Sequence, residues 1–186
     1  MRGTMLRASL FACALLAARP AAAQETPEEV AGRYFRVTQA EDWKGAARMM
    51  HPRALEAFKA MFVDLAAADE DGVLFPRVFA IEASAVRGTS AADLFARAME
   101  RLQARQDGLG EMMRSASFTL LGHVMEGDTA HVVYRLSTRV MDAPVSQTGV
   151  VSLLRDGQAW KPLLNADVQN LFAAMRVAVE HEEELE

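Results

Sequence analysis

The sequence predicts an α+β protein, with amphipathic helices in the N-terminal half and antiparallel hairpins in most of the C-terminal half. Apolar residues recur with helical spacing between residues 26 and 106. From Ser117 onward the spacing changes to the alternation that is typical of strands. The dipeptides Gly127-Asp128 and Asp156-Gly157 are short hairpin signals, and hairpins make neighbouring strands antiparallel.

The first helix is predicted to begin after Thr26, which is a good N-cap. Pro27 suits the first helical position, and the two glutamates that follow complement the helix dipole. One apolar face is predicted from residues spaced i, i+4 and i+7, which are Val30, Tyr34 and Val37.

Two more helices are predicted before the strands, over residues 53–69 and 89–106. The earlier one has an apolar stripe of Leu55, Phe58, Phe62 and Leu65, and the later one is capped by Ser90 with Asp93 three residues on. Between them, the stretch VLFPRVFAI (residues 73–81) predicts a short strand interrupted at Pro76.

Four strands and a helix complete the predicted domain, which spans residues 24–180. Residues 118–140 hold two strands around Gly127-Asp128, residues 148–155 hold a third, and residues 158–164 hold a fourth. Asn165 is predicted to cap a C-terminal helix over residues 166–180. The charged stretch at residues 181–186 reads as a frayed acidic tail.

Residues 1–23 have the pattern of a secretory signal peptide. A basic start is followed by an apolar run over residues 8–18, and three alanines precede the predicted cleavage before Gln24. The run is shorter than the roughly 20 residues that span a membrane, so no membrane association is expected after cleavage. An alternative is a lipoprotein anchored through Cys13. The sequence therefore predicts an exported protein, in the periplasm or outside the cell.

Charge excludes some partners. The 20 basic residues fall to 17 once Arg2, Arg7 and Arg19 are removed with the signal, against 25 acidic residues. Because no basic cluster offsets this balance, neither nucleic acid nor an anionic lipid surface is a predicted partner.

The histidines do not predict a metal site. With a two-residue loop at Gly127-Asp128, His123 lies opposite Val132 and His131 opposite Val124, so the two imidazoles point to opposite faces. A three-residue loop would instead bring both within reach of one ion, but no third ligand is placed by the pattern. The acidic residues fall in caps, turns and polar helix faces, apart from Glu82. No catalytic residue, metal or cofactor is predicted.

Four residues are the predicted ligand contacts: Tyr34, Tyr134, Arg135 and Trp160. In a regular register Trp160 would share a face with Leu153 and Arg135, which would give a pocket floor with a cation for a carboxylate. In the alternative, Trp160 is core and Arg135 lies along the outer face with its head in water. A bulge near Gly149 would reverse these faces.

The order of the elements, together with AEDWKGAARMMHP and DGQAWKPL, resembles the nuclear transport factor 2-like superfamily, which includes SnoaL-like and ketosteroid-isomerase-like proteins. The resemblance implies a cone-shaped fold, in which N-terminal helices pack in the concave face of a curved antiparallel sheet and leave a pocket between them. Dimerisation through the outer sheet face is common in that superfamily, so the resemblance also implies a homodimer of this kind. The extra C-terminal helix and the segment over residues 82–95 depart from this pattern.

The function predicted from the sequence is that of an exported, non-catalytic binding protein. Its cavity would take a small apolar or amphipathic ligand or a protein partner. One alternative is a lyase or isomerase acting on a hydrophobic small molecule in the same cavity. A second alternative is a dimeric structural module whose cavity is filled by side chains, namely Phe35, Phe58, Phe118 and Trp160.

Overall fold

The structure is a computed structural model that describes residues 24–69, 71–105, 109–140 and 143–183. The predicted signal peptide, with Cys13, lies outside the described residues. In chain order the elements are α1 (Pro27–Gln39), α2 (Trp43–Met49), α3 (Pro52–Ala68), α4 (Leu74–Phe79), the short 3-10 turn η1 (Ala83–Ala85), α5 (Ala91–Arg105), α6 (Leu109–Ser115), β1 (Ser117–Glu126), β2 (Thr129–Val140), β3 (Ala143–Asp156), β4 (Ala159–Pro162) and α7 (Ala166–Glu183).

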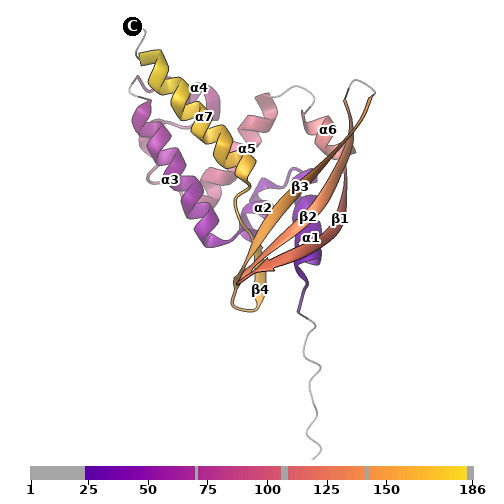
Figure 1. Cartoon of the computed structure of the whole chain (residues 1–186). Helices are drawn as coiled ribbons and strands as arrows, with labels where there is room; N and C mark the ends of the chain where they lie inside the picture. The colour runs from indigo at the N-terminus through magenta and orange to yellow at the C-terminus, as the bar shows by residue number, and fades with distance from the viewer. Residues whose placement is uncertain (1–23, 70, 106–108, 141–142, 184–186) are drawn as a thin grey trace, which may run out of the picture.

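The predicted α+β class is confirmed: helices accompany a four-stranded antiparallel sheet in the order β1-β2-β3-β4 (Figure 1). Glu126 pairs with Thr129, so the first hairpin has the predicted two-residue loop. In the last hairpin Asp156 pairs with Ala159, which puts the loop at Gly157-Gln158, one residue later than predicted. Both loops start with a glycine at positive φ, which is the position where a hairpin loop favours glycine.

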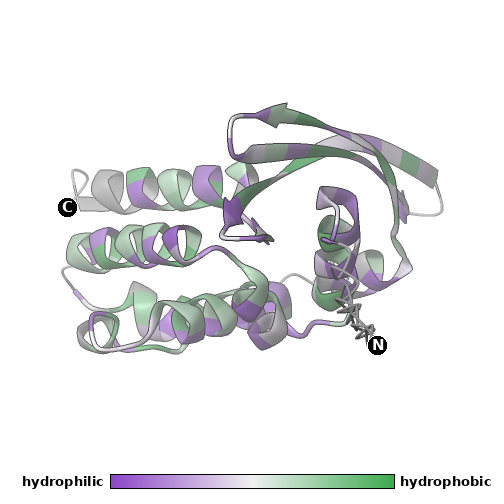
Figure 2. Ribbon diagram, turned by 90° about the horizontal axis from the view of Figure 1, so that it is seen from below, coloured by the Kyte–Doolittle hydropathy of each residue, from purple (hydrophilic) through white to green (hydrophobic). Residues whose placement is uncertain are grey.

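The helices divide into two groups. The strands arch over α1, which contacts all four of them, while α6 contacts β2 (Figure 2). Helices α3, α4, α5 and α7 pack on one another beside the sheet, and α2 joins α1 to α5. The structure does not confirm the predicted cone, because α3 and α5 form a helical layer of their own instead of filling the concave face.

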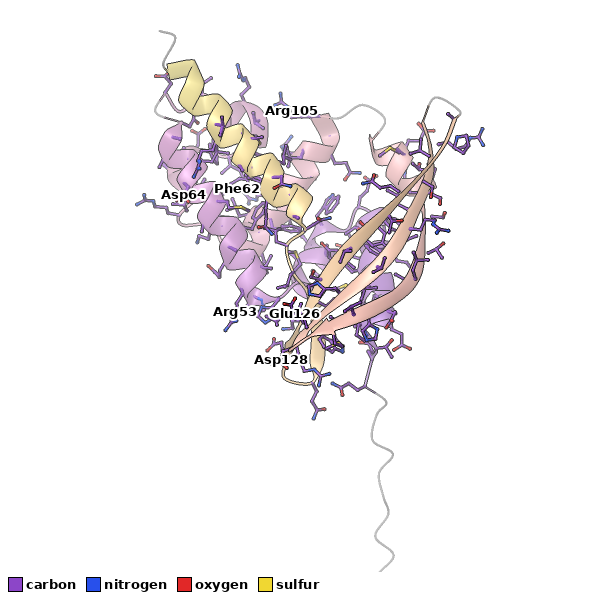
Figure 3. The ribbon with its side chains drawn as sticks, in the orientation of Figure 1. Arg53, Phe62, Asp64, Arg105, Glu126 and Asp128 are labelled. Atoms are coloured by element: carbon purple, nitrogen blue, oxygen red, sulfur yellow. The ribbon has the colours of Figure 1, made fainter. Side chains whose placement is uncertain are left out.

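The helical layer is held by a set of rings that we call the phenylalanine cluster. Its members are Phe58, Phe62, Phe75, Phe79, Phe95 and Phe172. Phe62 points from α3 toward α7, whereas Asp64 of the same helix points to solvent (Figure 3). The ring centroid of Phe62 lies 4.9 Å from that of Phe58, 4.8 Å from that of Phe79 and 4.9 Å from that of Phe172. Phe172 is the α7 residue buried in this core, and Val168 and Met175 of the same helix pack against it.

The short strand predicted at residues 73–81 is wrong: the chain forms helix α4 there. Phe75 and Phe79, four residues apart, both face the phenylalanine cluster. Pro76 is tolerated because it lies in the first turn, where a backbone N–H has no partner within the helix. Burial of the rings on one short helix therefore outweighs the β propensity of the sequence.

A second core lies between α1 and the sheet, and we call it the α1–sheet cluster. Its buried members are Val30, Ala31, Phe35, Ala130, Val132, Val151, Leu153 and Trp160. The N-terminus of α1 is fixed as predicted, since the backbone N–H of Glu29 donates to the Thr26 hydroxyl and the Glu29 carboxylate accepts from the Thr26 N–H.

The bounds of the helices agree with some of the predictions and differ from others. Ser90 caps α5 with Asp93, as predicted. The short helices α2 and α6 were not predicted, and α7 extends through Glu183, three residues into the predicted tail. Within the described part of the chain, no helix combines the length and apolar character needed to cross a bilayer.

Candidate functional site

The structure brings three of the four predicted ligand contacts to the α1 side of the sheet. Tyr134 and Trp160 belong to β2 and β4, and Tyr34 comes from α1. Arg135 is exposed and lies on the opposite face, because it follows Tyr134 on the same strand and side chains alternate. Trp160 and Leu153 share a face, as predicted, but the placement of Arg135 with them is wrong, and the alternative with Trp160 in the core and Arg135 on the outer face holds.

A different arginine lies against Trp160. The guanidinium carbon of Arg155 is 4.5 Å from the centroid of the indole ring, within the range of a cation–π contact. Arg155 and Trp160 are direct cross-strand partners in the last hairpin. A two-residue loop at Gly157-Gln158 would have revealed this pair from the sequence.

Tyr134 packs in an aromatic group with Phe35 and Phe118. Its ring centroid lies 4.7 Å from that of Phe35, edge to face, and Phe35 stacks on Phe118 at 4.4 Å. On β3, Gly149 lies directly opposite Tyr134, and a Cβ there would come within 2.6 Å of the ring. Glycine is needed at position 149 because the Tyr134 ring covers its backbone. The β2–β3 register shows no bulge near Gly149, so the faces are not reversed there; the register shift lies in β1, between Leu120 and Gly122.

Tyr34 lies where the two cores meet, since it packs against both the phenylalanine cluster and the α1–sheet cluster. Burial raises the pKa of Tyr34 to about 12, because removal from water disfavours the phenolate. Tyr34 therefore acts as a neutral packing residue at neutral pH.

Two adjoining hollows lie beside β3, between the sheet and the helical layer, and together we call them the β3 groove. One has a volume of about 450 Å³ and lies against the start of α3; the other has about 320 Å³ and lies against Tyr134 and Leu136. Val150, Asn165 and Ala166 line both. The groove exists because the chain leaves β3 after β4 ends and crosses to α7, leaving most of β3 uncovered.

The walls of the β3 groove combine apolar and polar groups. Leu163, Leu164, Leu136 and Val150 supply apolar surface, while Ser152, Asn165 and Gln169 supply polar groups. Arg53 is the one charged side chain among the described lining residues, and it lies at the first turn of α3 (Figure 3). Such a surface suits an amphipathic ligand with an anionic or polar end.

A third hollow of about 520 Å³, the charged cleft, separates the α1–α2 turn from α5. Three of its four carboxylates have local partners. Asp42 accepts from the backbone N–H of Gly45, the Asp93 carboxylate accepts from the hydroxyl of the α5 cap Ser90, and Glu41 pairs with Arg114. Trp43 donates its indole N–H to the Gln103 side chain at 2.9 Å. These contacts are explained by helix capping and by the α2–α5 packing, so we regard the β3 groove as the candidate site.

His131 links Ser152 and Glu126 across the outer face of the sheet. Its Nδ1 lies 2.9 Å from the Ser152 hydroxyl oxygen, and its Nε2 lies 3.1 Å from a Glu126 carboxylate oxygen. Such an order of groups activates a serine nucleophile in hydrolases. Here the Glu126 side chain is 83% exposed, so water screens its charge. The residues on either side of Ser152 pair with β2, so their N–H groups are not free to bind an oxyanion. The contact is a cross-strand polar link.

The two sheet histidines lie on opposite faces, as predicted from the two-residue loop. His123 contacts Glu28 of α1 at 2.6 Å, on the side away from His131. The hydrogen bond from His123 holds the pKa of Glu28 below its usual value. Across residues 24–183, leaving aside the positions not described, no three or more His, Cys, Asp or Glu side chains form a group that would hold a metal ion.

No family model, no curated protein and no solved structure matches this chain. The resemblance to the nuclear transport factor 2-like superfamily stays a prediction.

Sequence reasoning found Tyr134 but missed the other residues that define the β3 groove. Arg53, Leu163 and Asn165 belong to a helix start and an interelement connection, where no periodic pattern marks them. The one available signal was the length of β3. Its 14 residues exceed the 4 of β4, so part of its edge has to lie outside the last hairpin.

Proposed function

We propose that this protein is an exported binding protein whose site is the β3 groove. Its ligand is amphipathic. The apolar part lies against Leu136, Tyr134 and Leu163, and the polar or anionic end lies near Arg53. The proposal adopts the predicted secretory signal over residues 1–23, with the mature chain beginning at Gln24. A mass measurement of the exported protein tests that start.

One observation carries the proposal: two hollows of about 450 and 320 Å³ share a wall beside a largely uncovered strand. Each lies within or near the size range of ligand sites, and both have mixed apolar and polar walls. The lyase or isomerase alternative needs an acid or base at the ligand. Among the described lining residues there is no carboxylate and no histidine, so binding is the function that the groove supports best.

The test is native mass spectrometry of the protein purified from its own periplasm or medium, followed by titration with laurate as an amphipathic probe. We expect a retained small molecule or peptide, or laurate binding in the micromolar range. Val150→Arg places a long side chain where the two hollows meet, so it should abolish the binding of laurate. Val124→Arg is the matched control, since Val124 is also an exposed strand valine but does not line the groove. Equal binding by both variants contradicts the proposal.

A second candidate function, a homodimer through the outer sheet face, is favoured by a separate observation. Val124 and Val150 are exposed there by 64% and 48%. Exposed apolar residues gathered on one sheet face suit a protein interface. Sedimentation equilibrium should show a dimer of the wild-type protein, and Val124→Arg should dissociate it. A wild-type protein that stays monomeric at about 100 µM, a concentration at which even a weak dimer would form, rules out this candidate.

A further inference from the structure

The open edge of β3 has backbone groups that no strand of the described sheet satisfies. β3 spans Ala143–Asp156, but β4 pairs only with its last four residues, Leu153 to Asp156. After Pro162 the chain turns away, and Leu163 makes a last hydrogen bond to β3. Residues 143–151 therefore form an edge beside the β3 groove.

Two hydrogen bonds fix which backbone groups face this edge. The N–H of Leu163 donates to the C=O of Ser152 at 2.8 Å, so the Ser152 carbonyl points to the open side. The N–H of Arg155 donates to the C=O of Asp128 at 3.0 Å, which lies on the β2 side. Backbone direction alternates along a strand, and the β2–β3 register is unbroken from Thr129↔Leu154 to Val140↔Ala143.

It follows that Val150, Thr148 and Ser146 direct their N–H and C=O groups to the open side. Pro144 has the same parity, so its missing N–H falls on the edge and costs no bond to β2, which is where a strand tolerates proline. The edge thus presents a donor and an acceptor at every second residue, about 6.8 Å apart.

The two hollows flank this edge in a way that suits an extended chain. Tyr134 and Leu136 line one hollow, on the α1 side of the sheet, and Arg53 and Leu163 line the other, next to α3. Successive side chains of an extended peptide point to opposite sides, so alternate residues would enter alternate hollows.

We propose that the β3 groove takes an extended segment of a partner protein, which adds to the sheet as a strand beside β3 and places an acidic side chain near Arg53. This inference rests on the proposed function and names its ligand class. A regular series of backbone donors and acceptors is matched by another backbone, whereas a small amphipathic molecule meets one or two of them. Arg53 makes no ion pair among the described residues, which leaves its charge for the partner.

The test begins with random nine-residue peptides displayed on phage and selected against the immobilised full-length protein. Selected peptides are then synthesised with single N-methyl groups along the backbone. We expect N-methylation at alternate residues to weaken binding about fivefold to tenfold per position, since each removes one hydrogen bond, and the intervening positions to change affinity much less.

Variants of the protein test the same edge from the other side. Thr148→Pro removes an N–H that faces the edge and should weaken peptide binding about tenfold, while Thr148→Val keeps the N–H and should weaken binding much less than Thr148→Pro. Arg53→Gln should lower affinity for peptides with an acidic residue and leave their neutral counterparts unchanged. Circular dichroism checks that each variant is folded, and the N-methyl series needs no variant at all.

The outcomes separate the inference from the proposed function. Selected peptides whose affinity is insensitive to N-methylation, or sensitive at every position alike, overturn strand addition. Failure to select any peptide, while laurate binds and Val150→Arg blocks it, overturns the inference and leaves the amphipathic binding site. If neither peptide nor laurate binds, both proposals fail.

Discussion

The helical layer and the sheet layer of this protein are stabilised in different ways. The helical layer encloses the phenylalanine cluster with α3, α4, α5 and α7, so its rings are surrounded by other rings. The sheet layer has one helix, α1, against all four strands, and several of its aromatic residues stay partly accessible. One layer is closed on its own, and the other is covered on one side only.

The difference indicates which layer holds the fold together and where the proposed binding site lies. A closed aromatic core supplies a rigid scaffold, and a sheet that is covered on one face leaves an edge and walls to which a ligand has access. The β3 groove lies at the junction, where α3 and α7 of the helical layer meet the uncovered part of β3. The following predictions test this division, from the largest expected effect to the smallest.

Phe62→Ala tests whether the helical layer carries the stability. Phe62 is fully buried and its ring packs against four others, so the variant should lose about 3–5 kcal/mol of unfolding free energy. Urea denaturation followed by circular dichroism measures the loss. Phe118→Ala is the counterpart in the sheet layer and should cost less, because Phe118 is partly exposed. An equal or larger loss for Phe118→Ala would reverse the comparison.

Tyr34 tests the junction between the layers through pH. Its folded pKa of about 12 exceeds the ordinary value of 10.0, so the folded state favours the neutral phenol. The contribution of the neutral Tyr34 phenol to the unfolding free energy is fully present below pH 10 and is lost as the pH rises through 12. The wild type should lose about 1.4 kcal/mol by pH 11, and about 2–3 kcal/mol at higher pH, relative to Tyr34→Phe.

The measurement is urea denaturation of the wild type and of Tyr34→Phe at pH 9 and pH 11. Other titrating groups are common to both proteins and cancel in the difference. Parallel curves for the wild type and Tyr34→Phe would place Tyr34 outside the buried junction.

Gly149→Ala tests the wall of the β3 groove. The new Cβ would lie 2.6 Å from the far end of the Tyr134 side chain, which has to swing away from the strand. We expect a loss of about 1–2 kcal/mol in unfolding free energy and a change in ligand affinity, since Tyr134 lines the groove. Gly88→Ala, at an exposed site with no contact nearer than 3.8 Å, should change stability by less than about 0.5 kcal/mol. Similar effects from both substitutions would argue against the close packing at Gly149.

The hairpins and the longest helices could be predicted because local rules decide them. A two-residue loop fixes the register of β1 and β2, and this placed His123 and His131 on opposite faces. Helix α4 was missed for the opposite reason. A helix of six residues is too short for its buried rings to show a clear helical period. Pro76 lies in the first turn, where proline does not disrupt a helix, so its presence is not evidence against one.

The candidate site was less accessible from sequence. Arg53 of α3 lies about a hundred residues before Val150 of β3, and Asn165 belongs to the connection between β4 and α7. Only the docking of the helical layer beside the sheet brings these three residues together. Of the predicted neighbours of Trp160, Leu153 does share its face, whereas Arg135 does not. The loop at Gly157-Gln158 makes Arg155 the cross-strand neighbour of Trp160, and Arg135 lies on the other face.

The contact between Glu28 and His123 tests how α1 is held to the sheet, and it is the smallest effect. The hydrogen bond from His123 lowers the folded pKa of Glu28 below its ordinary value. Its contribution is therefore present above that ordinary value of 4.5 and is lost as the pH falls through the lower, folded value. Both side chains are about 30% exposed, so the contact should contribute about 0.5 kcal/mol.

Glu28→Gln should thus be about 0.5 kcal/mol less stable than the wild type at pH 7 and equal to it at pH 3, by urea denaturation at both values. Glu56→Gln, an exposed change on α3 in the helical layer, should show no such pH dependence. If Glu28→Gln behaves like Glu56→Gln, α1 is held to the sheet by its apolar face alone. Helix α1 would then depend on the α1–sheet cluster for its position against the strands. Truncation of Phe35, which stacks on Phe118, would be the change that releases α1 from the sheet.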